Sequence, residues 1–102
     1  MSATIGLFAT TATSMPHVLG IGRAAQKRSC RVEIFLSGDA VHLTQDPSFP
    51  ELLELGRVAV CEVSYLDRGY ERLAIPGLVD RDFVTQGRNA ELVGECDRYL
   101  VL

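Results

Sequence analysis

The chain has 102 residues, of which 47% are hydrophobic and 23% are charged, a composition typical of one globular domain and unlike that of a disordered chain. Its net charge of −3 and its scattered basic residues offer no positive patch for a phosphate backbone, so we expect no nucleic-acid binding. The apolar stretch 5–9 is too short for a membrane span or a signal-peptide core. These features predict a single domain over residues 1–102, located in the cytoplasm and not in contact with a membrane.

Apolar and partly β-branched segments recur along the chain and predict strands. The segments are 4–9 (TIGLFA), 30–37 (CRVEIFLS), 57–63 (RVAVCEV), a brief fourth at 82–86 (DFVTQ), and 98–102 at the end. Segments with helical signals separate them, and this alternation favours parallel pairing through right-handed crossovers. We therefore predict an α/β fold, a three-layer α/β/α sandwich around a mostly parallel sheet of about five strands.

Two helices precede the third predicted strand. Pro16 in a first turn predicts a helix over about residues 16–28. Ser48 and Glu51 have capping-box spacing, and Gly56 is a stop signal, which together predict a short second helix.

The second half of the chain has weaker signals. Ser64 and Asp67 repeat the cap-like spacing and predict a short helix almost directly after Cys61. Residues 71–81 have no sustained period and contain a Pro-Gly pair, which predicts a mobile loop. A last helix is expected to open at about Gly87.

One glycine motif raises the alternative of nucleotide binding. Residues 20–25 match G-x-G-x-x-A, and Asp39 follows Gly20 at close to the spacing of a dinucleotide-binding site. The glycines of such a site directly follow a strand, whereas these lie inside a predicted helix, well after the strand that ends near Ala9. The chain is also too short for two mononucleotide-binding halves, so this alternative ranks last.

Metal ligands are not indicated. The three cysteines, Cys30, Cys61 and Cys96, include no C-x-x-C pair, and His17 and His42 lie far from one another and from any cysteine at ligand spacing. We expect free thiols in a reducing compartment, and neither a disulfide framework nor a metal or organic cofactor.

Cys61 stands where an apolar strand is predicted to end and a helix to begin. Reactive groups collect at the carboxyl ends of parallel strands, and a helix start or a nearby arginine such as Arg68 lowers the pKa of a thiol. The competing interpretation is that Cys61 is a small buried hydrophobic residue. Asp39, in the Gly-Asp turn after the second strand, is likewise either a supporting acid at this edge or a residue that only closes its turn.

The segment VAVCEVSYLDRGY resembles the active-cysteine region of the DsrE/TusD-like sulfur-relay family, in which Arg-Gly follows the cysteine at seven and eight residues. Here these positions are Cys61, Arg68 and Gly69. The segment IFLSGDAVHL is similar to that family's second strand and turn, and ECDRYLVL to its final Asp-Arg and strand.

This resemblance implies a DsrE-like sandwich in which Cys61 carries sulfane sulfur as a persulfide, with Ser64, Arg68 and Asp39 as supporting residues. It also implies transfer between sulfur donor and acceptor proteins, in a sulfur-oxidation or tRNA-thiolation type of pathway. Homo-oligomers, trimers or hexamers, or hetero-oligomers with sister subunits are expected. The alternative is a non-catalytic oligomeric subunit or binding module with the same fold.

Overall fold

The computed structural model describes residues 3–71 and 75–102, and the described part forms one five-stranded sheet. The strands lie in the order β4-β3-β2-β1-β5, and every pairing is parallel. Their bounds are β1 (Thr4–Ala9), β2 (Arg31–Leu36), β3 (Arg57–Cys61), β4 (Phe83–Val84) and β5 (Arg98–Val101). The predicted α/β class is confirmed, and the sheet is entirely rather than mostly parallel.

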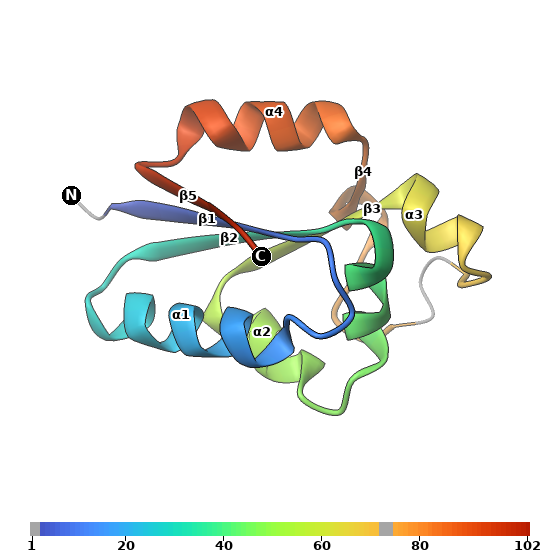
Figure 1. Ribbon diagram of the computed structural model, residues 1–102, viewed down its shortest axis with the longest axis horizontal. Coiled ribbons are helices and arrows are strands. Elements are labelled where there is room, and N and C mark those ends of the chain that lie inside the picture. The colour runs from blue at the N-terminus through green and yellow to red at the C-terminus, as the bar shows by residue number, and fades with distance from the viewer. Residues whose placement is uncertain (1–2, 72–74) are drawn as a thin grey trace.

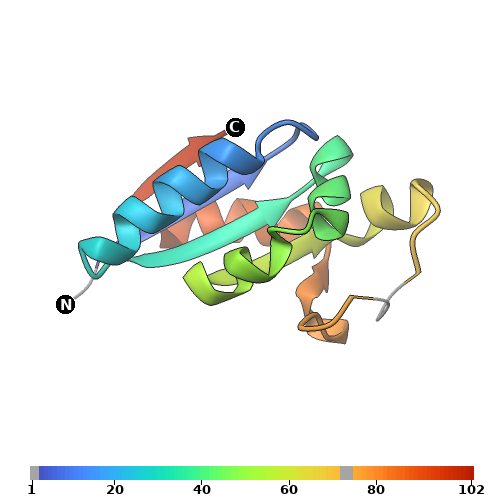
Figure 2. The ribbon, with the colours of Figure 1, turned by 90° about the horizontal axis from the view of Figure 1, so that it is seen from below.

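Helices cover both faces of the sheet (Figures 1 and 2). They are α1 (Met15–Lys27), the 3-10 helix η1 (Gly38–Gln45), α2 (Phe49–Leu55), α3 (Glu62–Asp67), the 3-10 helix η2 (Asp80–Asp82) and α4 (Gln86–Glu95). In Figure 1, α1 and α2 lie below the sheet and α4 lies above it, while α3 projects beyond the end of β3. This arrangement gives the three layers that the alternation of strands and helices predicts.

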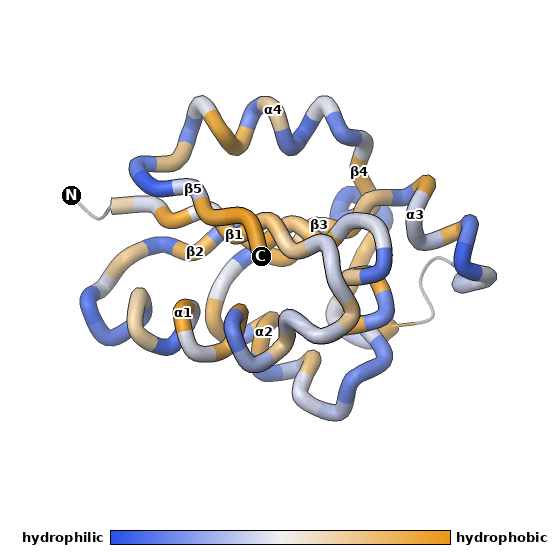
Figure 3. Tube along the Cα trace, in the orientation of Figure 1, coloured by the Kyte–Doolittle hydropathy of each residue, from blue (hydrophilic) through white to orange (hydrophobic). Residues whose placement is uncertain are grey.

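The larger core lies between the sheet and the α1/α2 layer. Alternate side chains of β2 are buried in it, namely Val32, Ile34 and Leu36. Helices α1 and α2 contribute Val18 and Leu52. The hydropathy of the chain follows this arrangement, because the strands are mainly apolar and the helices alternate (Figure 3). Burial on this face accounts for the two early helices, which have clear start and stop signals in the sequence.

The opposite face carries a smaller cluster of three buried residues, Phe35, Cys61 and Leu92. Leu92 is the buried residue of α4 and packs that helix against the sheet. Phe8 packs edge-on against Phe35, with ring centroids 5.6 Å apart. Cys61 therefore belongs to the thin α4 layer and not to the main core.

Several predicted boundaries shift. The third strand ends at Cys61 rather than residue 63, and α3 begins at once with Glu62. Ser64 lies inside α3 and is not its cap, so the predicted capping role of Ser64 is wrong; Cys61 occupies the cap position. Of the predicted loop 71–81, residues 72–74 lie outside the described residues, and the segment that follows contains η2.

The glycine motif does not form a nucleotide-binding loop. Gly20 and Gly22 lie within α1, five residues or more after its start at Met15, and no strand leads directly into them. Gly22 is instead a packing position, because an added Cβ there would lie 2.9 Å from Leu55 Cδ1 of α2. The close contact between α1 and α2 explains this glycine without a ligand.

Candidate functional site

Three polar or sulfur-bearing side chains converge where β2, β3 and β4 end. Ser37 follows β2, Cys61 is the last residue of β3, and Gln86 follows β4 by two residues. These three strands are neighbours in the sheet, so their carboxyl ends bring together residues that are far apart in the sequence. Sequence reasoning identified Cys61 but missed Ser37 and Gln86.

The chain turns in opposite directions after β3 and β4. The segment that follows β3 contributes Tyr65 and Leu78 to the core on the α1/α2 face, whereas β4 leads into α4 on the other face. In open parallel sheets, the point where neighbouring strands send their connections to opposite faces is the usual position of a functional site. Cys61 lies at this point.

The Cys61 thiol is enclosed but has polar neighbours. The residue is only 3% exposed. The side-chain Nε2 of Gln86 donates to Cys61 Sγ at 3.3 Å and to Ser37 Oγ at 2.8 Å. An amide NH₂ has two hydrogens to donate, and both contacts are directed at this site. The sulfur is thus held by a bridge between the ends of three strands.

Two opposing effects set the pKa of the Cys61 thiol. Burial is the largest single influence and raises the pKa, because it penalises the thiolate. The hydroxyl and backbone N–H of Ser64 lower it, as do Gln86 and Ser37, and the net pKa lies below its ordinary value. Polar groups at the helix start therefore favour the thiolate despite the burial.

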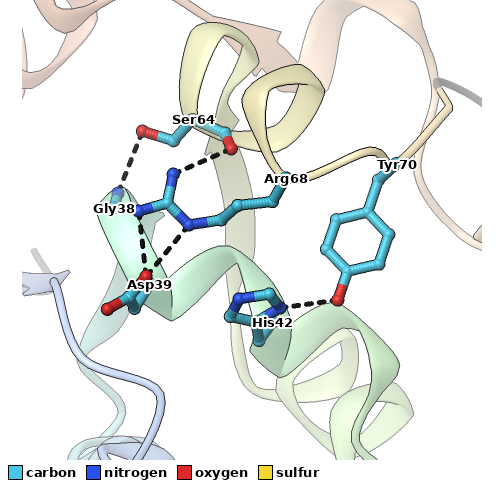
Figure 4. A network of polar contacts seen from close by, with 6 residues as sticks. All are labelled: Gly38, Asp39, His42, Ser64, Arg68 and Tyr70. Atoms are coloured by element: carbon cyan, nitrogen blue, oxygen red, sulfur yellow. Dashed lines mark hydrogen bonds and ion pairs between the residues drawn. The ribbon is translucent and has the colours of Figure 1, made fainter.

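Arg68 and Asp39 form a separate contact that joins α3 to η1 (Figure 4). The guanidinium donates from Nε and Nη2 to Asp39 Oδ1 at 3.0 and 2.9 Å, and from Nη1 to the Ser64 carbonyl at 3.1 Å. The backbone N–H of Gly38 donates to Ser64 Oγ at 3.0 Å. The structure thus brings the three predicted supporting residues together. Of these three, Ser64 is the one that lowers the thiol pKa, while Arg68 and Asp39 contact Ser64 and η1.

A second polar contact joins η1 to the segment that follows α3. His42 Nδ1 and the Tyr70 hydroxyl are 2.6 Å apart (Figure 4), and the Tyr70 ring lies 5.0 Å from that of Tyr65. Tyr65 is fully buried, and its hydroxyl has no hydrogen-bond partner within the part of the chain that the structure describes. These aromatic contacts fix η1 against α3 and so support the position of Ser64.

The other cysteines lie at less suitable places. Cys30 precedes β2 at the amino edge of the sheet, and Cys96 is the C-cap of α4. Burial, followed by the nearby Glu33, raises the pKa of the Cys96 thiol, the reverse of Cys61. No group of three or more histidine, cysteine or acidic side chains able to hold a metal occurs among residues 3–71 and 75–102.

Among residues 3–71 and 75–102, no helix has the length and apolar character needed to cross a bilayer.

The depressed pKa predicts a pH-dependent stability. At pH values between the folded and unfolded pKa of Cys61, the unfolded chain binds more protons than the folded chain. The free energy of unfolding therefore increases as pH rises through this interval. The advantage of Cys61 over Cys61→Ser should be full above the unfolded pKa and disappear as pH falls through the folded pKa. Urea unfolding at several pH values would measure it.

Both proteins in that comparison should also carry Cys30→Ser and Cys96→Ser. The Cys96 pKa is raised, so Cys96 would otherwise contribute a stability change of opposite sign with pH. A stability difference that stays flat or declines with rising pH would show that the Cys61 thiolate is not favoured by the fold.

Comparisons with known proteins leave the family open. A scan against protein-family models, a search of curated proteins and a search of solved structures each found no match to this chain. The resemblance to the sulfur-relay family therefore stays a prediction carried by short sequence motifs, chiefly the one around Cys61.

Proposed function

We propose that this protein is a sulfur carrier that relays sulfane sulfur as a persulfide on Cys61, as the resemblance to the DsrE/TusD-like family implies. The observation that carries the proposal is the position of the Cys61 sulfur and its hydrogen-bonding neighbours. The sulfur lies at the carboxyl end of β3, an interior strand of the sheet, where hydrogen bonding from Ser64, Gln86 and Ser37 outweighs burial and lowers the thiol pKa. A cysteine that only filled the core would not have these polar neighbours.

The chemistry needs two displacements and no cofactor. The Cys61 thiolate attacks the terminal sulfur of a donor persulfide, forming Cys61–S–SH while the donor leaves as its thiolate. An acceptor thiolate then attacks the same terminal sulfur, and Cys61 leaves as a thiolate. One sulfur atom is moved and no electrons are gained or lost overall. The low thiol pKa favours both the attack and the second departure.

Donor and acceptor proteins are the partners this function requires, and they belong to the same proposal. So do a cytoplasmic location and assembly into a trimer, a hexamer or a hetero-oligomer with sister subunits. Native mass spectrometry of the purified protein would measure the assembly.

The test is mass spectrometry of the intact protein after incubation with a low-molecular-weight persulfide. We expect a gain of one sulfur mass that a reducing thiol removes and that Cys61→Ser lacks. The matched control is Cys30→Ser combined with Cys96→Ser, which should gain the sulfur as the unmodified sequence does. Equal gain by Cys61→Ser would remove Cys61 from the mechanism.

One observation favours a second candidate, a non-catalytic subunit or binding module with the same fold. Cys61 is only 3% exposed, which is the burial of a packed core residue. This candidate predicts no sulfur gain on Cys61 and slow alkylation without a shifted thiol pKa.

A further inference from the structure

Gln86 is an exposed residue whose side-chain amide contacts the buried Cys61 sulfur. Cys61 is 3% exposed and Ser37 is 8% exposed. Both contacts of the Gln86 amide nitrogen run inward, at 3.3 Å to the sulfur and 2.8 Å to the serine hydroxyl oxygen. The amide is therefore held against the buried Cys61 and Ser37 side chains by two hydrogen bonds.

Sulfur exchange requires that the Cys61 sulfur be accessible to another molecule. A donor sulfur has to reach Cys61 Sγ directly, because the new bond forms at that atom. With the residue 3% exposed, the observed arrangement gives the thiolate its hydrogen bond and leaves almost no access. Some group next to the sulfur has to move, and of its three hydrogen-bonding neighbours Gln86 is the exposed residue, whereas Ser64 is half-buried and Ser37 is buried.

The start of α4 is well placed for such a movement. Leu92 is the buried residue of this helix, in its second half, and the bond from Tyr99 Oη to Asn89 ties the helix to β5 three residues after Gln86. Arg88 pairs with Glu91 and Glu95 of the same helix, and its contact with the sheet is the longer-range attraction of Glu33 on β2. Segments with few buried contacts open locally at low cost. Gln86 is the first residue of α4, ahead of these anchors.

We propose that Gln86 is a positioning residue that gates Cys61: its amide covers and holds the sulfur in the closed state, and swings outward to admit a sulfur donor. The purpose of the gate rests on the proposed sulfur relay. The gate itself concerns access to the thiol, so it can be tested with a reagent that carries no sulfane sulfur.

The experiment measures the rate of Cys61 alkylation by iodoacetamide against pH, in protein that carries Cys30→Ser and Cys96→Ser. Gln86→Ala should raise two quantities, the apparent pKa of the thiol and the plateau rate of alkylation. The apparent pKa should rise because a hydrogen bond to the thiolate is lost. The plateau rate at high pH should increase by about three- to tenfold, the factor by which losing one hydrogen bond shifts an opening equilibrium.

Gln26→Ala is the matched control. Gln26 is also an exposed glutamine whose Nε2 donates to a neighbouring element, the Glu54 carbonyl, but it lies at the amino edge of the sheet. It should change neither the plateau nor the apparent pKa. Gln86→Asn keeps the amide on a shorter side chain and should give intermediate values, and it decides the question should Gln86→Ala fail to fold.

A plateau rate for the Gln86 variant that stays within about twofold of the parent, or falls, would overturn the gate and leave Gln86 as a structural contact. A raised plateau in a protein that forms no persulfide would keep the gate and reject the sulfur relay. The gate and the sulfur relay can therefore be rejected independently of one another.

Discussion

Gly56→Ala is expected to destabilise the fold by about 3 kcal/mol, the upper end of what overpacking ordinarily costs. An added Cβ at Gly56 would lie 2.3 Å from the Val32 carbonyl oxygen and 2.8 Å from Val32 Cβ. The backbone at Gly56 is extended, with φ at −176°, so the cost is steric and not a matter of glycine conformation. The clash involves backbone of β2 and cannot be relieved by turning a side chain. Urea unfolding followed by circular dichroism would measure the effect.

Gly20→Ala is the matched control, because the same atom is added where nothing lies within 4 Å of it. Gly20 is exposed in the interior of α1, where alanine is favoured over glycine by about 0.5–1 kcal/mol. The control should therefore stabilise the protein. Equal stability changes in the two variants would contradict the close approach of Gly56 to β2.

The fold was predictable mainly where strong local signals and burial coincide. Pro16 and the early apolar face marked α1 to within one residue at each end, since the observed helix is Met15–Lys27. The end of the third strand was not predicted correctly, because Val63 is β-branched and continues the apolar run of β3. In the structure Val63 lies in α3 and is 65% exposed. A β-branched residue indicates a strand only when its side chain is buried in the sheet.

The site was predictable only in part for a different reason. Cys61 carries a signal of its own, a thiol at the end of an apolar strand, whereas Gln86 is an ordinary polar residue 25 positions later in the chain. What brings Gln86 to the sulfur is the adjacency of β3 and β4, and the order of strands in a sheet is a tertiary property. The usable signal was the brief predicted strand 82–86, whose end falls on Gln86. A search for polar residues at the ends of all predicted strands would also have found Ser37.

Arg68 shows the limit of sequence spacing as a guide to chemistry. Its distance from Cys61 along the chain gave it a predicted influence on the thiol, and the short helix does bring it back toward η1. The carboxylate of Asp39 and the carbonyl of Ser64 then engage its guanidinium. Arginine forms such geometrically demanding contacts readily, and here they organise the serine that acts on the sulfur.

Phe35→Ala is expected to cost about 3–5 kcal/mol of folding free energy, as deletion of a fully buried aromatic ring does. Phe35 is 0% exposed and lies in one cluster with Cys61 and Leu92, beneath the only helix that covers this face in the described residues. Leu92 is the one buried side chain that α4 contributes to this cluster, so little buried apolar surface from the helix can fill the space of the lost ring. Thermal and urea unfolding would measure the loss.

Two controls separate a cavity from a general effect of truncation on this layer. Val93→Ala shortens a side chain of the same helix that is 52% exposed, and should change stability by no more than about 0.5 kcal/mol. Phe35→Leu keeps most of the buried volume and should fall between the two. If Phe35→Ala cost no more than Val93→Ala, α4 would not be held to the sheet through this cluster. The enclosure of Cys61 would then have to come from the polar bridge of Gln86 alone.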